Sequence, residues 1–211
     1  MSHEKLVTGP DHAAATILLA HGAGGAMDTQ WMEDMSSALA RNGLQVIRFE
    51  FDYMASRRIS GKRSPPPRAD RLLGEFQSVT NEIGKHQKLL IGGKSMGGRI
   101  GSMIADDLYQ NGVVAGLVCL GYPFHPVGKA EVLRTAHLSD LLTPALICQG
   151  TRDPFGSREE VASYDLSKQI SMHWLEDGDH DFKPRKGITG RTLADNIDDA
   201  AARVASWANA L

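Results

Sequence analysis

The sequence predicts an α/β fold in which a mostly parallel central sheet is flanked by helices, within one domain spanning residues 1–211. Short apolar runs alternate with longer amphipathic stretches along the chain, which is the pattern of βαβ units. Six strand signals with helices between them leave no stretch over for a second domain. A chain of 211 residues, 42% hydrophobic and 23% charged, also has the size and composition of one globular domain.

The first elements follow one another closely. Residues 16–20 form a short β-rich run, and residues 28–42 then carry apolar side chains at helical spacing. Gly43 stands where a helix ends, and residues 45–51 are predicted as the next strand. Residues 52–67 break this rhythm with four basic side chains and three consecutive prolines, so we expect a long ordered loop there.

The rest of the chain returns to the alternating pattern. Residues 113–120 form a continuous apolar run, typical of a strand that is buried on both faces. No insertion long enough for a cap domain separates Leu120 from Ala145, so we expect a fold without a cap. The remaining predicted elements are a helix over 68–86, a strand over 88–92, a helix over 96–110, a strand over 145–149, a helix near 158–165, a strand over 171–175 and a helix over 193–211.

Charge and composition exclude several classes of function. The formal net charge of -2 argues against a general binder of nucleic acid or anionic membranes, which would need a surplus of basic residues. No apolar stretch reaches the roughly 18 residues of a membrane span, and the N-terminus lacks the form of a signal peptide. Cys119 and Cys148 both lie in apolar runs, which favours buried free thiols. We therefore expect a cytoplasmic protein, monomeric or homodimeric.

A Gly-x-Ser-x-Gly motif formed by Gly93, Ser95 and Gly97 lies between a predicted strand and a predicted helix. This strand-turn-helix setting is the one that a nucleophile elbow requires. Small residues two positions before and after the serine let the sharp turn close and expose the hydroxyl. The start of the helix adds a positive dipole end near any developing anion.

Asp153 and His180 each follow the end of a predicted strand. Because ligands meet open α/β sheets at the carboxyl ends of the strands, both side chains are candidates for the same site as Ser95. A serine hydroxyl needs a base to take its proton, and the imidazole needs a carboxylate to orient it. The chain order Ser95, Asp153, His180 is the nucleophile-acid-base order of hydrolases built on such a sheet.

A glycine-rich turn, His21-Gly22-Ala23-Gly24-Gly25, follows the first predicted strand. Its backbone N–H groups could point at an oxyanion. The glycine spacing matches neither a dinucleotide-binding loop nor a phosphate loop with its lysine. A plain tight turn with His21 as a packing residue remains the alternative.

Taken together, these motifs resemble the compact α/β-hydrolases related to dienelactone hydrolases, in a serine-nucleophile branch. The resemblance is carried by His21 to Gly25, by Gly93 to Arg99 and by residues 178–182, and it spans nearly the whole chain. It implies an α/β-hydrolase fold with Ser95 as nucleophile, Asp153 as acid and His180 as base. It also implies an oxyanion hole made by the N–H of Met96 and the N–H of Ala23 or Gly24. Dienelactone hydrolases proper have a cysteine nucleophile where this chain has Ser95.

The expected activity is hydrolysis of an ester or related acyl bond of a small molecule, with no cofactor and no metal ion. The alternative is a binding or scaffold protein that keeps the elbow without turnover. An acyltransferase or a peptidase using the same three residues also stays open. For substrate recognition the candidates are Arg57 and Arg58, which could offer guanidinium groups to an anionic substrate, and His125, which follows a strand end. The alternatives are a solvated loop whose charges only keep the protein soluble and an ordinary loop histidine.

Overall fold

The computed structural model describes residues 3–62, 64–84 and 86–211, so Arg63, one of the basic residues of the predicted loop, lies outside the described part. A seven-stranded sheet forms the centre of the molecule, in the order β1-β3-β2-β4-β5-β6-β7. Only β1 runs antiparallel to its neighbour, β3, and the other pairings are parallel. The strands are β1 (Lys5–Thr8), β2 (Thr16–Ala20), β3 (Gln45–Phe49), β4 (Leu89–Lys94), β5 (Gly116–Leu120), β6 (Ala145–Gly150) and β7 (Ile170–Leu175).

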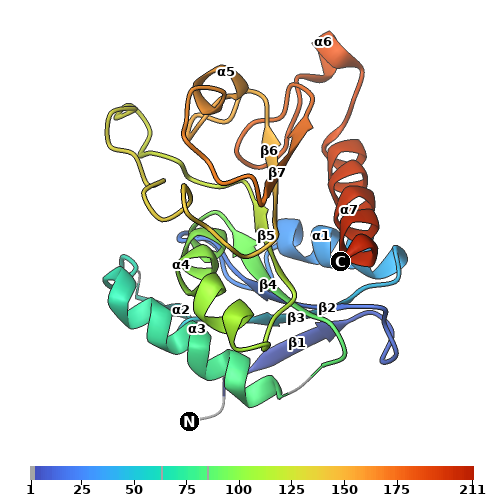
Figure 1. The fold of residues 1–211 in the computed structure, drawn as a ribbon. Coiled ribbons are helices and arrows are strands. Elements are labelled where there is room, and N and C mark those ends of the chain that lie inside the picture. Colours follow the sequence, from blue (N-terminus) through green and yellow to red (C-terminus); the bar gives the residue numbers. More distant parts are fainter. Residues whose placement is uncertain (1–2, 63, 85) are drawn as a thin grey trace.

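Helices cover both faces of this sheet (Figure 1). On one face, α1 (Gln30–Arg41) and α7 (Leu193–Ala210) pack side by side and bury apolar side chains against the strands. On the other face, α3 (Ala69–Ile83) and α4 (Met96–Gln110) pack together over a second apolar cluster that includes Phe76. The five strands from β2 to β6 are buried on both faces for this reason, as expected for the central strands of a parallel sheet, whereas β1 and β7 at the two edges are partly exposed.

The segment predicted as a loop over 52–67 is helical in its first half, and this expectation was wrong. Asp52–Ser60 forms α2, with an acidic residue in its first turn and two arginines in its last turn. Those charges complement the helix dipole, and Gly61 ends the helix in a left-handed conformation with φ of 68°. The proline run begins only after that stop, so the prolines do not oppose the helix.

Four other elements were missed or are shorter than predicted. Strand β1 was not predicted, and neither was the short helix α6 (Lys186–Thr189). The helix expected near 158–165 is confined to α5 (Arg158–Val161), where Ser157 and Glu160 form a capping box. Strand β5 begins three residues later than the predicted run.

Two other expectations, the missing cap and the unpaired cysteines, are confirmed. Residues 121–144, between β5 and β6, contain no helix or strand and no cap domain. Both cysteines are buried and unpaired, on the neighbouring strands β5 and β6. Within the described residues, no helix combines the length and apolar character needed to cross a membrane.

Candidate active site

Ser95 occupies the sharp turn between β4 and α4 and is one of few non-glycine residues with a positive φ. Its φ of 51° and ψ of −114° lie outside the regions that L-residues ordinarily adopt. A Cβ on Gly93 would lie 2.5 Å from the Ala20 carbonyl oxygen, and one on Gly97 would lie 2.6 Å from the same atom. The turn can therefore close only with glycine on both sides of the serine, as the sequence predicted.

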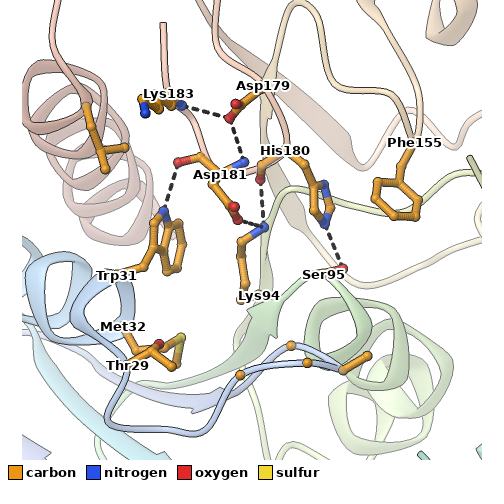
Figure 2. Close-up of a pocket in the computed structure, with 15 residues that line it drawn as sticks. Thr29, Trp31, Met32, Lys94, Ser95, Phe155, Asp179, His180, Asp181 and Lys183 are labelled. Carbon is orange, nitrogen blue, oxygen red and sulfur yellow. Dashed lines mark hydrogen bonds and ion pairs between the residues drawn. The ribbon is translucent and has the colours of Figure 1, made fainter. Parts of the chain in front are cut away.

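His180 connects Ser95 to Asp153 through both of its ring nitrogens. Its Nε2 atom lies 2.9 Å from the Ser95 hydroxyl oxygen, and its Nδ1 atom lies 2.8 Å from an Asp153 carboxylate oxygen. Figure 2 shows the imidazole directed at the serine from the segment that follows β7. Since β4, β6 and β7 are parallel, their carboxyl ends bring the three side chains to one edge of the sheet. The structure thus assembles the three residues that the sequence predicted together.

Asp153 is fully buried, and its carboxylate is held by neighbours on β6 and the following loop. One oxygen accepts a hydrogen bond from the Gln149 side-chain amide at 2.9 Å, and the other accepts one from the Phe155 backbone N–H at 2.8 Å. The Phe155 ring lies against the imidazole, with 4.3 Å between the ring centroids of Phe155 and His180. These contacts fix the carboxylate and the imidazole in a single arrangement.

The glycine-rich turn after β2 is shaped by His21, which is fully buried. The Phe51 backbone N–H donates to its Nε2 atom at 3.2 Å, so the ring proton sits on Nδ1, which lies 2.7 Å from the Gly22 carbonyl oxygen. Burial lowers the pKa of His21, which keeps this ring neutral. His21 is therefore a packing residue, and the role of the turn depends on its backbone N–H groups.

Side chains also donate hydrogen bonds to the carbonyl oxygens of this turn. The Tyr53 hydroxyl donates to the Ala23 carbonyl at 2.9 Å, on the side of the turn that faces α2. In a trans peptide the N–H points opposite to the C=O. The N–H of Ala23 follows the Gly22 carbonyl, and the N–H of Gly24 follows the Ala23 carbonyl, so both are directed away from these acceptors. Both residues line the same cavity as Ser95, and no hydrogen bond between described residues occupies either N–H group.

Lys94, the residue before the serine, is a charged group that sequence reasoning did not single out. Its side chain is only 9% exposed and donates to the His180 carbonyl oxygen at 2.6 Å. Its ammonium also lies 3.2 Å from an Asp181 carboxylate oxygen and 5.3 Å from the centre of the Trp31 ring (Figure 2). Burial lowers the pKa of Lys94, while Asp181 favours the charged form. Lys94 thus ties the histidine-bearing segment to the end of β4.

Two cavities meet at Ser95. The first, of about 600 Å³, is lined by the glycine-rich turn, Trp31, Lys94, His180 and the charged residues that follow it, among others. The second, of about 390 Å³, lies toward α3 and α4 and includes Met96 and Phe155 in its lining. In the described part of the chain, no group of three His, Cys, Asp or Glu side chains could hold a metal ion.

The structure does not bring the predicted substrate-binding residues to these cavities. Arg58 pairs with Asp28 and Glu50, which occupy its guanidinium. Arg57 donates to the Gly24 carbonyl at 3.4 Å from the far side of the turn. His125 is 3% exposed and lies 3.5 Å from a carboxylate oxygen of Glu160 on α5. The segment does reach the second cavity, but through Pro66 and Pro67.

A second serine-histidine pair lies in α4 and the loop between β5 and β6. The Ser102 hydroxyl oxygen is 2.8 Å from the Nε2 atom of His137. Ser102 is 3% exposed, lines neither cavity, and donates to the Arg99 carbonyl one turn earlier. Among the described residues, no carboxylate pairs with His137. This pair therefore lacks the access and the orienting acid that Ser95 has.

The sheet order, the strained serine turn and the absence of a cap define an α/β-hydrolase fold without a lid. Solved structures with this fold superpose on nearly the whole chain. A serine hydrolase homologue from Coxiella burnetii is 20% identical, with 96% of this chain and 91% of that chain covered and a TM-score of 0.71. A lidless serine hydrolase from Xanthomonas campestris is 20% identical, with 97% and 89% covered and a TM-score of 0.70.

A dienelactone hydrolase from Anabaena variabilis is also similar, at 17% identity, with 97% of this chain and 90% of that chain covered and a TM-score of 0.71. The family model of the alpha/beta hydrolase domain matches residues 13–209. The chain therefore belongs to the α/β-hydrolase domain family, as the resemblance of its motifs indicated.

Proposed function

We propose that this protein is a serine hydrolase that cleaves an ester or related acyl bond of a small molecule. The observation that carries the proposal is the continuous hydrogen-bonded line from Ser95 through His180 to the buried Asp153. The serine stands on a strained turn at the meeting point of two cavities, where a substrate has access to it. A scaffold protein would need none of these features.

The reaction follows from what each group can do. The Ser95 oxygen attacks the acyl carbon while His180 Nε2 takes the hydroxyl proton, and Asp153 stabilises the imidazolium. The N–H groups of Met96 and of Ala23 or Gly24 hold the oxyanion. The bond to the leaving group then breaks, and His180 returns the proton to that group. Water, deprotonated by His180, next attacks the acyl-serine ester, which releases the acid and restores the Ser95 hydroxyl.

A fluorophosphonate probe tests the activated nucleophile, because it reacts with serines whose proton a base can remove. We expect labelling of wild type at Ser95, located by mass spectrometry of the labelled peptide. Ser95→Ala should abolish labelling and lower hydrolysis of 4-nitrophenyl esters by about 10³-fold or more. Asp153→Asn should slow both by up to about 10⁴-fold.

Ser102→Ala is the matched control, because it removes the serine of the other serine-histidine pair. We expect it to keep both labelling and esterase activity, since Ser102 lines neither cavity. Labelling that survives Ser95→Ala but is lost in Ser102→Ala would refute the assignment. A wild-type protein that is neither labelled nor active on any ester would favour the scaffold alternative.

A further inference from the structure

The second cavity has an unusual combination of residues for a site beside a nucleophile. Its lining is apolar except for Ser95 and two arginines, Arg99 and Arg134. No carboxylate lines it, whereas Asp179 and Asp181 line the first cavity along with two lysines. The two cavities that meet at Ser95 therefore differ in charge, because the charged residues that line the second are both basic.

Arg99 is placed by α4 on the same side as the serine. Its backbone N–H donates to the Ser95 carbonyl oxygen at 3.0 Å, which sets the two residues one helical turn apart. Side chains four apart lie on one helix face, with about 6 Å of rise between them. The Arg99 side chain is half-buried, and its Nε atom is fully buried with no hydrogen-bond partner.

Arg134 reaches the same cavity from the loop between β5 and β6. Its backbone N–H donates to the Phe124 carbonyl at 2.7 Å, and its carbonyl accepts from the Tyr122 hydroxyl at 3.0 Å. Both aromatic residues are fully buried, so the main chain at Arg134 is firmly anchored. Burial and the nearby Arg99 both lower the pKa of Arg134, so the Arg134 guanidinium lies in partly buried surroundings close to a second positive charge.

Neither arginine has an acidic partner. Across residues 3–62, 64–84 and 86–211, no carboxylate lies within ion-pair distance of Arg99 or Arg134, although most other arginines in the chain are paired. The four residues outside these ranges are Met1, Ser2, Arg63 and Lys85, none of which is acidic. A partly buried guanidinium group is stabilised by a hydrogen-bonded anion, and the described residues supply none here, so a ligand carboxylate would fill that role.

The position of His180 indicates which half of a substrate meets the arginines. His180 lines the first cavity but not the second. Because His180 must hand its proton to the leaving group, the leaving group occupies the first cavity. The acyl chain then extends into the second cavity.

We propose that Arg99 and Arg134 form an anion-binding subsite and that the preferred substrates carry a carboxylate on their acyl half, as in monoesters of dicarboxylic acids. This inference rests on the proposed function, since it names the substrate class of that site. The guanidinium groups bind the distal carboxylate, and the apolar walls, including Pro66 and Pro67, enclose the methylene chain.

Three esters test this subsite. The 4-nitrophenyl monoester of adipic acid has the acyl carboxylate, 4-nitrophenyl heptanoate is its neutral counterpart, and 4-(hexanoyloxy)benzoate bears the carboxylate on the leaving group. We expect wild type to prefer the adipate ester. Arg99→Gln and Arg134→Gln should each lower kcat/KM for that ester by about 10- to 100-fold, mainly through KM, and change the heptanoate value by less than about 3-fold. Arg68→Gln, a matched loss of an exposed arginine outside the lining, should change neither.

Equal losses on the adipate and heptanoate esters, or none on either, would overturn the subsite while leaving the hydrolase proposal intact. A selective loss on 4-(hexanoyloxy)benzoate would overturn its assignment to the acyl half. If wild type hydrolyses no ester, calorimetry with monomethyl adipate decides independently of catalysis. Binding to Ser95→Ala that is at least 10-fold weaker in Ser95→Ala/Arg99→Gln would support the subsite, and equal affinities would overturn it.

Discussion

Replacing Ser95 by glycine should make the protein more stable than replacing it by alanine, although both changes remove the proposed nucleophile. The two variants lose the same hydroxyl and the same hydrogen bond to His180. They differ only in the Cβ atom, which alanine keeps at a φ of 51° and a ψ of −114°. Glycine adopts positive φ without that steric penalty, so the comparison isolates the strain stored at the turn.

The size of the effect can be worked out from the backbone angles. A non-glycine residue in a sparsely populated region costs about 1–3 kcal/mol. Glycine gives back about 0.4–1 kcal/mol of that gain, because it makes the unfolded chain more flexible. Ser95→Gly should therefore exceed Ser95→Ala in free energy of unfolding by about 1 kcal/mol, which corresponds to a Tm higher by roughly 2–4 °C for a chain of this length.

Differential scanning calorimetry and urea titrations on both variants measure this difference. Equal m-values in urea would show that the two denatured states are alike, so that the difference in midpoint reports the native turn. A Ser95→Gly protein that is no more stable than Ser95→Ala would refute the reasoning, because the serine turn would then carry no strain.

Two further predictions concern Lys94 and Glu82. Lys94→Met keeps the apolar stem of the side chain but removes the donor to the His180 carbonyl. We expect kcat to fall by about 10- to 100-fold, with little change in KM or in Tm. An unchanged kcat would contradict a positioning role for Lys94. Glu82 accepts hydrogen bonds from Lys5 and His3, which lower its pKa to about 2. A lowered pKa in the folded state stabilises the protein above the ordinary carboxyl range, and this contribution is lost as the pH falls toward 2. Glu82→Gln should therefore be less stable than wild type by up to about 1 kcal/mol at pH 7 and equal to it near pH 2, measured by thermal unfolding.

The parts of the site that could be predicted from the sequence are those fixed by local sterics. The turn at Ser95 leaves no room for a Cβ atom on the flanking glycines, so glycine is required there. This requirement can be recognised in the seven consecutive residues 92–98. Asp153 and His180 were found because each directly follows an apolar strand, and parallel strands bring their carboxyl ends to one edge. Gln149, by contrast, lies inside a strand, and nothing in its sequence context indicates that its amide holds Asp153.

The expectation that rested on charge alone does not match the structure. Four basic residues before a proline run predicted an anion-binding loop, yet Arg58 is occupied by Asp28 and Glu50 from distant segments. The arginines that line a cavity at Ser95 without an ion pair among the described residues are Arg99 and Arg134, 35 positions apart, which only the folded chain brings together. The spacing does contain one signal for Arg99. It lies four positions after Ser95 in a predicted helix, and residues four apart share one helix face. Strand β1 was missed because its four residues are partly exposed and lack a continuous apolar run.

The order of the strands has a consequence for the synthesis of the protein. From β4 to β7 the sheet grows at one edge in the order of the chain, and Ser95 is 85 positions ahead of His180. Since a nascent chain emerges from its N-terminus, the serine turn can form while the segment that carries His180 is still unmade. A partly synthesised chain thus displays Ser95 without its hydrogen-bond partner, and the Ser95, His180 and Asp153 side chains can meet only when β7 has joined the sheet.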